Sequence, residues 1–315
     1  MELVHSYQVG LNELCTERID YFIAASGYQR RSTFLAEQVR IGDAKKILLT
    51  PADGQNPELQ QKNEEVFAKL GFLSLNTLQN ERLEIEKILH QICNETHCKD
   101  LNILVDYSCM TKLSYASIID FLIRNDLPNE RINLFFSYTP KQINTLPAKI
   151  KVKSLQPIVE FNQKVNQKPT SLIIGLNSNI EPVKEVIERI SPSRIFLFVP
   201  RFQHDECYHS NISILNGELI ERVPSENVFK YPANQPDQII SMLTSVCLDQ
   251  RLDSNVILIP HGPKTFALSS ILLTFRYPDI RLLEIDQSEK KVQDEGFPAN
   301  DPIIVKSVFS QEEDY

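Results

Sequence analysis

The stretch Ile103–Leu113, ILVDYSCMTKL, constrains the fold more than any other part of the chain. An apolar run ends at Asp106, a hydroxyl-rich turn follows, and a helical pattern begins at Lys112. This order predicts a buried strand, a ligand-facing loop and a helix start. The stretch Val256–Leu268, VILIPHGPKTFAL, repeats the pattern with Lys264 at the start of its helix. The chain therefore contains the same strand–turn–helix logic twice.

The remaining sequence alternates between strand-like and helix-like segments. Strands are expected at 19–26, 45–50, 103–106, 132–139, 171–176, 194–199, 227–231, 256–259 and 280–286. Helices are expected around 34–39, 57–69, 78–90, 112–124, 177–190, 211–223, 237–247 and 264–275. Asn177 or Ser178 is the candidate N-cap of the fifth of these helices, which carries Pro182 in its first turn. Such alternation predicts parallel pairing through right-handed crossovers. We therefore expect an α/β chain of two tandem Rossmann-like domains, with mainly parallel sheets flanked by helices.

The expected domain boundary lies in the segment 140–169, which is polar and shows no strong hydrophobic period. A chain of 315 residues is long enough for two domains that each bury a core. We place the N-terminal Rossmann-like domain at 1–165 and the C-terminal one at 166–315. The last apolar run, Ile303–Phe309, is expected to form an edge strand.

Composition limits the classes of partner. The formal charge is −8, and no block of basic residues occurs, so broad binding to duplex nucleic acid is disfavoured. No apolar run is long enough to span a bilayer, and the first residues lack a signal core, so we expect a cytoplasmic protein that does not bind membranes. The six cysteines have no disulfide-framework spacing and are expected to be free thiols.

Several motifs are absent from the sequence. We find no GxxxxGK[ST], GxGxxG, HExxH or GxSxG pattern, which disfavours ordinary ATPases, dinucleotide oxidoreductases, zincins and elbow hydrolases. Two groups of potential zinc ligands lack a standard paired spacing. They are Cys93, His97 and Cys98, and His204, Cys207 and His209. We therefore expect neither a metal nor a cofactor.

Ligands of open parallel sheets bind beyond the carboxyl ends of the strands, where helix N-termini attract anions. Four loops qualify, at 26–31, 106–112, 175–179 and 260–264. The candidate ligand-binding residues in and beside these loops are Ser26, Gly27, Arg30, Arg31, Asp106, Ser108, Thr111, Lys112, Asn177, Ser178, His261, Gly262, Lys264 and Thr265.

Lys112 and Lys264 each begin a predicted helix, where the positive end of the helix dipole disfavours a cation. An anion bound nearby would explain both lysines, whereas a solvated lysine at an ordinary helix start is the alternative. Their recurrence favours contact with a phosphate or nucleotide. Arg30 and Arg31 are candidates for a phosphate clamp or for a solvated helix face.

Two residues are candidates for catalysis. Asp106 follows a buried strand, where it could hold a ribose hydroxyl or act as a general base. A turn-forming or helix-capping aspartate is the alternative. His261 lies beside the proposed anion site and is the best acid–base candidate among the six histidines.

The second half, from SLIIGLNSNIEPVKEVIERI to HGPKTFALSSILL, resembles the CRISPR-associated Rossmann fold (CARF) sensor domains. The resemblance lies in Glu181-Pro182 near the first helix and in Pro263-Lys264-Thr265 before a small-residue helix. In the first half, DYSCMTKLSYAS is similar to the later motif through Thr111-Lys112. The Gly-Gly that precedes this pair in the family is missing from both halves.

The resemblance implies binding of a nucleotide, typically a cyclic oligonucleotide, at the interface of two such domains. Two copies in one chain would form that pair internally, and a partner effector protein would carry the output. The leading hypothesis is a nucleotide-responsive sensor or regulatory protein in antiviral defence, binding a phosphate-rich ligand between its halves. The alternatives are an enzyme that hydrolyses or transfers a nucleotide group through Asp106, Lys112 and His261, and a non-catalytic interaction subunit.

Overall fold

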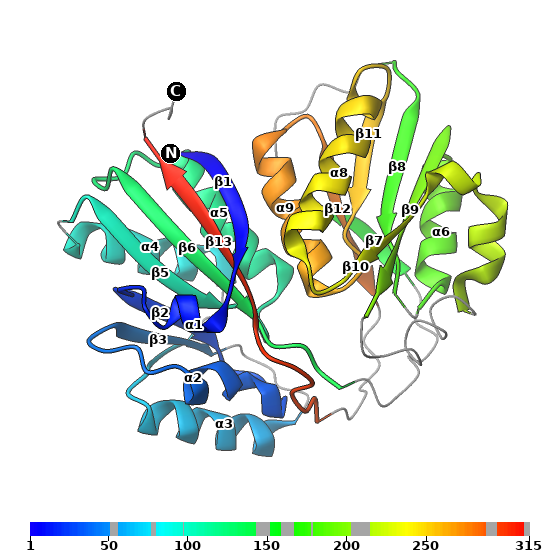
Figure 1. Ribbon diagram of the computed structural model, residues 1–315. Coiled ribbons are helices and arrows are strands. Elements are labelled where there is room, and N and C mark those ends of the chain that lie inside the picture. Colours follow the sequence, from blue (N-terminus) through cyan, green and yellow to red (C-terminus); the bar gives the residue numbers. More distant parts are fainter. Residues whose placement is uncertain are drawn as a thin grey trace. The chain divides into compact units, whose positions relative to one another are not determined.

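The computed structural model describes residues 1–50, 56–76, 80–96, 98–142, 152–158, 167–177, 179–202, 215–287 and 295–311. The chain divides into two compact units, and the described residues of each form one mainly parallel sheet with helices on its faces (Figure 1). The expected α/β class with two Rossmann-like halves is confirmed. Within the described ranges, no helix has the length and apolar character needed to cross a membrane.

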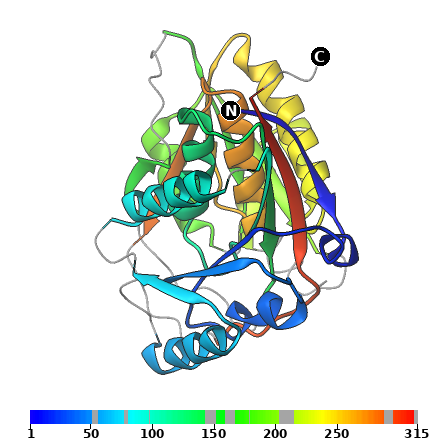
Figure 2. The same cartoon turned by 90° about the vertical axis from the view of Figure 1, so that its left-hand side faces the viewer.

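Unit 1 contains a seven-stranded sheet in the order β1-β13-β6-β5-β2-β3-β4. The strands from β6 to β4 are parallel to one another, whereas β13 is antiparallel to both of its neighbours. Figures 1 and 2 show β1 and β13 side by side. The strands are β1 (Glu2–Val9), β2 (Tyr21–Ala25), β3 (Lys45–Thr50), β4 (Leu73–Asn76), β5 (Asp100–Asp106), β6 (Arg131–Tyr138) and β13 (Ile303–Ser310).

Helices cover both faces of this sheet. The α2/α3 face of the sheet has a core of buried apolar residues that includes Phe22, Leu104 and Phe135 from the strands and Leu35 and Phe67 from the helices. The helices α4 and α5 pack against each other on the other face (Figure 1). The helical elements are α1 (Leu11–Leu14), η1 (Arg30–Ser32), α2 (Phe34–Gln38), α3 (Pro57–Lys69), α4 (Glu81–Glu95) and α5 (Lys112–Arg124).

Unit 2 contains a six-stranded sheet in the order β10-β9-β8-β11-β12-β7, in which β7 alone is antiparallel to its neighbour. Its strands are β7 (Val152–Pro157), β8 (Thr170–Gly175), β9 (Arg194–Arg201), β10 (Val228–Pro232), β11 (Asn255–Ile259) and β12 (Arg281–Gln287). Its helical elements are α6 (Glu181–Ile190), residues 215–222, η2 (Ser225–Asn227), α8 (Pro236–Arg251) and α9 (Lys264–Arg276). The helices α6 and 215–222 cover one face.

The two units share one topology. Numbered along the chain, the five parallel strands of each unit lie in the order 3-2-1-4-5, as β4-β3-β2-β5-β6 in unit 1 and β10-β9-β8-β11-β12 in unit 2. In both sheets an antiparallel strand lies beside the fifth of these strands. In this order the chain changes direction across the sheet between the first and fourth strands, which is the position where ligands bind in doubly wound folds. The switch points therefore lie between β2 and β5, and between β8 and β11.

The structure divides the chain differently from the expected domains 1–165 and 166–315. Unit 1 comprises 1–144 and 292–315, and unit 2 comprises 145–291. The run Ile303–Phe309 is not an edge strand, because β13 is inserted between β1 and β6. Its near-continuous burial fits an inner strand, but sequence order alone assigned it to the nearer domain. The segment 140–169 also contains β7, whose half-exposed residues gave no strong apolar period.

We predict that Ile304→Ala destabilises unit 1 by about 2–5 kcal/mol, because this side chain is fully buried in the core and its loss leaves a cavity. Leu73→Ala is the matched control, since Leu73 on the edge strand β4 is 66% exposed and should cost less than about 1 kcal/mol. Urea unfolding of both variants measures the difference. Equal losses would contradict the inner position of β13.

Candidate functional site

The loops that follow β2 and β5 meet at the switch point of unit 1. A Cβ atom at Gly27 would lie 2.6 Å from the Cys109 Sγ atom, so only glycine permits this approach. The Asn63 amide of α3 donates to the Gly27 carbonyl at 2.7 Å and to the Gln29 carbonyl at 2.9 Å. The two loops predicted from separate parts of the sequence are therefore brought together, and α3 holds the first of them through Asn63.

Arg31 is the buried cation of this switch point, with 5% of its surface exposed. Its Nη1 atom donates to the Thr139 carbonyl at 2.7 Å, at the end of β6. Burial opposes its positive charge, but interactions with Tyr138, Cys109 and Asp106 outweigh burial and raise the pKa of Arg31. The guanidinium therefore stays charged beside the carboxylate that ends β5.

Buried hydroxyl groups surround Asp106. The register of β5 and β6 pairs Asp106 with Ser137, so their side chains share the α2/α3 face of the sheet with Thr139. The Asp106 Oδ1 atom accepts the Ser108 N–H at 3.0 Å, and the Ser108 hydroxyl accepts the Thr139 N–H at 2.8 Å. Ser137 Oγ and Thr139 Oγ1 are fully buried and have no hydrogen-bond partner among the described residues. An unsatisfied buried hydroxyl costs about 1–3 kcal/mol, so these two groups leave unused hydrogen-bonding capacity next to Asp106.

Neither Ser137 nor Thr139 was predicted as a site residue. Both belong to the expected strand INLFFSYT, which was interpreted only as a strand. Polar residues at the end of an apolar strand could have identified them, because the same pattern led to the prediction of Asp106.

Arg30 contributes to the fold in a different way from Arg31. Its Nε atom forms an exposed ion pair with Glu295 at 2.6 Å, and its guanidinium lies 4.9 Å from the centroid of the Phe297 ring. The backbone N–H groups of Arg30 and Arg31 donate to the carbonyls of Glu295 and Gly296 at 2.7 and 3.0 Å. The returning C-terminal segment therefore occupies the backbone donors of η1, in one of the loops expected to bind an anion.

A carboxylate from the same chain lies at the N-terminus of α5. Thr111 is the N-cap residue, and its hydroxyl accepts the Ser114 N–H at 3.0 Å and donates to Glu81 at 3.0 Å. Ser114 also donates to Glu81. Thr111 thus has a structural role as a helix cap, and Lys112 is the first residue of the helix. Similarly, Ser26 is buried and donates to Glu64 of α3 at 2.7 Å.

In unit 2, glycines again permit a close approach across the switch point. A Cβ atom at Gly175 would clash with the Phe266 ring and lie 3.0 Å from the Gly262 backbone nitrogen. The Asn177 amide donates to the His261 carbonyl at 2.7 Å, which joins the loops after β8 and β11. Asn177 does not cap α6, because that helix begins at Glu181 with Ile180 as its N-cap residue.

His261 is buried, with 7% of its surface exposed, and its Nε2 atom lies 3.2 Å from the Asn179 carbonyl oxygen. The Asn179 side-chain nitrogen is buried without a hydrogen-bond partner among the described residues. Thr265 donates to the Ala233 carbonyl at 2.7 Å, and Lys264 is the first residue of α9. Ser178 lies outside the described residues. The second switch point therefore contains an imidazole and an amide, and its described part holds no buried arginine like Arg31.

Two cavities among the described residues lie away from both switch points. The smaller cavity, of about 190 Å³, lies in unit 1 and is lined by Val39–Asp43 and by Leu14, Cys15, Glu17, Arg18 and Ile19. The larger, of about 530 Å³, lies in unit 2 beside Arg194, the first residue of β9. Topology and buried polar groups define the switch points.

No protein-family model matches the chain, and a search of curated proteins gives no match either. The resemblance of the Thr111-Lys112 and Pro263-Lys264-Thr265 segments to sensor domains therefore supports a proposal only together with the site chemistry.

The described cysteines Cys15, Cys93, Cys98, Cys109 and Cys247 are free thiols. Within the same part of the chain, no three His, Cys, Asp or Glu side chains gather in an arrangement that could hold a metal ion. The two groups of potential zinc ligands named from the sequence include His97, His204, Cys207 and His209, which lie outside the described residues.

We predict that Arg31→Met destabilises the protein by about 3–5 kcal/mol, because it removes the bond to the Thr139 carbonyl and the cation beside buried Asp106. The double variant Arg31→Met/Asp106→Asn should recover part of this loss. Arg30→Met is the adjacent control and should cost less than about 1 kcal/mol, since its ion pair is exposed. Chemical unfolding tests all three, and equal effects at Arg30 and Arg31 would rule out the buried role.

Burial raises the pKa of the Cys93 thiol to about 11 and that of Cys247 to about 12. Because the thiolate is the reactive form, iodoacetamide at pH 8 should label exposed Cys15 well before these two. Unfolded thiols ionise near pH 9.0, so the stability contribution of Cys93 is complete below that pH and falls as the pH rises through about 11. Mass-spectrometric mapping measures the labelling, and equal rates at the three thiols would contradict the burial.

Proposed function

We propose that this protein is a nucleotide-responsive sensor or regulatory protein whose ligand carries phosphate groups. The observation that supports it most is the repeated switch point, where polar loops from two strands meet in each unit. Doubly wound folds bind nucleotides at this position because strand ends and helix N-termini converge there.

The chemistry of unit 1 suits the polar parts of a nucleotide. A carboxylate such as Asp106 accepts hydrogen bonds from ribose hydroxyls, and the buried hydroxyls of Ser137 and Thr139 supply further donors and acceptors. Lys112 at the start of α5 supplies a cation for a phosphate. The Glu81 carboxylate at the same helix N-terminus would repel a phosphate placed directly on the helix axis, which favours a phosphate near the lysine instead.

Unit 2 offers a related set of groups. Lys264 begins α9 as Lys112 begins α5, and Asn179 supplies a buried amide beside His261. Two units with the same topology suit a ligand of repeated nucleotides, such as a cyclic oligonucleotide. The contact of His261 Nε2 with a backbone carbonyl gives the imidazole a positioning role, which favours a sensor over an enzyme. An effector protein would then carry the antiviral output.

The direct test is isothermal titration of the full chain with cyclic and linear oligonucleotides, combined with mass spectrometry of nucleotides released on denaturation. We expect binding, and we expect chromatography to recover the ligand unchanged after incubation. Absence of binding by the wild-type protein to both ligand types and absence of co-purified nucleotide would reject the proposal, whereas cleavage of the ligand would identify an enzyme.

We predict that Lys112→Ala and Lys264→Ala each weaken ligand binding by roughly 10- to 100-fold, the effect of one lost charge-assisted hydrogen bond. Lys69→Ala in unit 1 and Lys230→Ala in unit 2 are matched controls, because both lysines are exposed and lie outside the switch-point loops. Titration at constant ionic strength gives the ratio. Equal affinities for all four variants would show that the ligand does not contact Lys112 or Lys264.

A further inference from the structure

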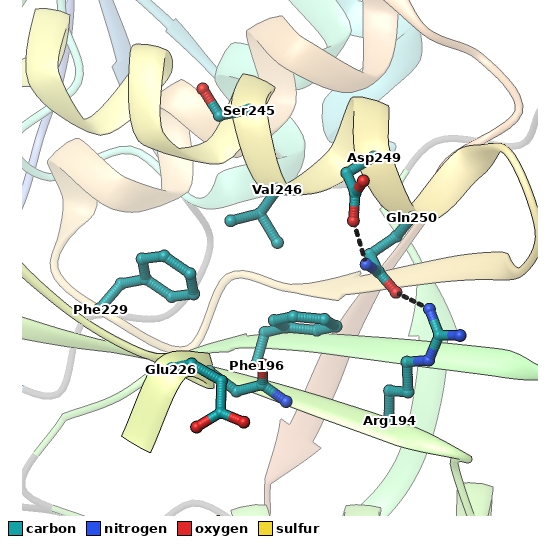
Figure 3. A pocket seen from close by; sticks show the side chains of 9 residues that line it. Arg194, Phe196, Glu226, Phe229, Ser245, Val246, Asp249 and Gln250 are labelled. Atoms are coloured by element: carbon teal, nitrogen blue, oxygen red, sulfur yellow. Dashed lines mark hydrogen bonds between the residues drawn. The ribbon is translucent and has the colours of Figure 1, made fainter. Parts of the chain in front are cut away.

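The larger of the two cavities, in unit 2, lies between α8 and the strands β9 and β10 (Figure 3). Its volume of about 530 Å³ falls in the range of small-molecule sites. It adjoins the amino end of β9, whereas the switch-point loops follow the carboxyl ends of β8 and β11. The lining residues are Arg194, Phe196, Glu226, Asn227, Phe229, Ser245, Val246, Asp249 and Gln250.

The inner part of this cavity is apolar and rigid. Phe196 of β9 and Val246 of α8 are 7% and 8% exposed, and Figure 3 shows their side chains facing each other. Phe229 of β10 stacks on Phe198, with 5.1 Å between the ring centroids. These side chains offer a fixed apolar surface for methylene groups and aromatic faces for a cation.

The charge of Arg194 is balanced within the chain. Its Nη1 atom donates to the Gln250 Oε1 atom at 3.0 Å, and its Nη2 atom forms an ion pair with Asp253 at 3.2 Å. Gln250 is itself buried and fixed, because it accepts the Ser171 hydroxyl at 2.9 Å. Arg194 therefore closes one side of the cavity with its guanidinium paired to Asp253 and bonded to Gln250.

Besides Arg194, the charged residues that line the cavity are two carboxylates. Glu226 of η2 and Asp249 of α8 are exposed, and Figure 3 shows them on opposite sides of Phe196. The Gln250 amide donates to the Asp249 Oδ2 atom at 2.7 Å, which orients this carboxylate at the rim. The two carboxylates and the apolar side chains between them suit a ligand with two separated cations joined by an apolar segment.

The geometry points to a binding site for an aliphatic polyamine in this cavity. One ammonium group pairs with Glu226 and another with Asp249, while the methylene chain lies over Phe196 and Val246. Alkyl ammonium groups stay protonated at neutral pH, as lysine does, so both ends carry a full charge. The overall charge of −8 also favours approach of a cation.

The test is calorimetric titration of the full chain with 1,4-diaminobutane, 1,5-diaminopentane and spermidine at constant ionic strength, with butylamine as the single-charge control. We expect at least one of the polyamines to bind about tenfold more tightly than butylamine. Glu226→Gln and Asp249→Asn should each reduce its affinity to that of butylamine, and Glu221→Gln, an exposed carboxylate outside the cavity, should leave it unchanged.

A second variant separates the cavity from general attraction to an acidic surface. Phe229→Leu keeps an apolar side chain but removes the ring face, so it should weaken the polyamine and butylamine by the same few-fold factor. The proposal is overturned if no polyamine exceeds butylamine, if Glu221→Gln has the same effect as the two cavity variants, or if tetralysine binds more tightly than every polyamine.

Discussion

The pairing of the first and fourth parallel strands in each unit is the constraint on which the candidate sites depend. β2 pairs with β5 and β8 pairs with β11, and the chain leaves each pair in opposite directions across the sheet. The loops that follow these strands consequently meet. Their approach is close enough to require glycine at Gly27 and Gly175, where a Cβ atom would overlap the facing loop or helix. The strand order and the glycines at positions 27 and 175 together allow the loops to meet at the switch points.

The two switch points differ in their electrostatics. Unit 1 buries a guanidinium beside a carboxylate, and the cost of burying that charge is offset by the Thr139 carbonyl and by neighbouring polar groups. Unit 2 has Asn177, Asn179 and His261 at the equivalent place, linked through backbone carbonyls. The two units therefore share a topology but differ in the side chains and charges at the switch point.

Within unit 2, the cavity proposed for a polyamine and the switch point lie at opposite ends of the parallel strands of one sheet. The switch point takes its groups from loops after β8 and β11, whereas the cavity takes Arg194 and Phe196 from the beginning of β9. Because β8 lies between β9 and β11, both sites rest on one rigid sheet. Either ligand would stabilise the folded unit through mass action.

The sequence by itself determined the class of fold and the loops that carry polar groups. The apolar runs before Asp106 and Pro260 specified buried strands, and the helices that start at Lys112 and Lys264 began at the expected residues, because hydrophobic period and punctuation are local properties. Only the tertiary structure decided that Arg31 is buried while Arg30 is exposed. The Arg31 side chain bonds to the residue that follows β6, whereas the Arg30 side chain pairs with Glu295 of the C-terminal segment, and both partners are distant in sequence. The same holds for β13, which joins the first sheet because strand pairing between distant segments is not encoded in their local pattern.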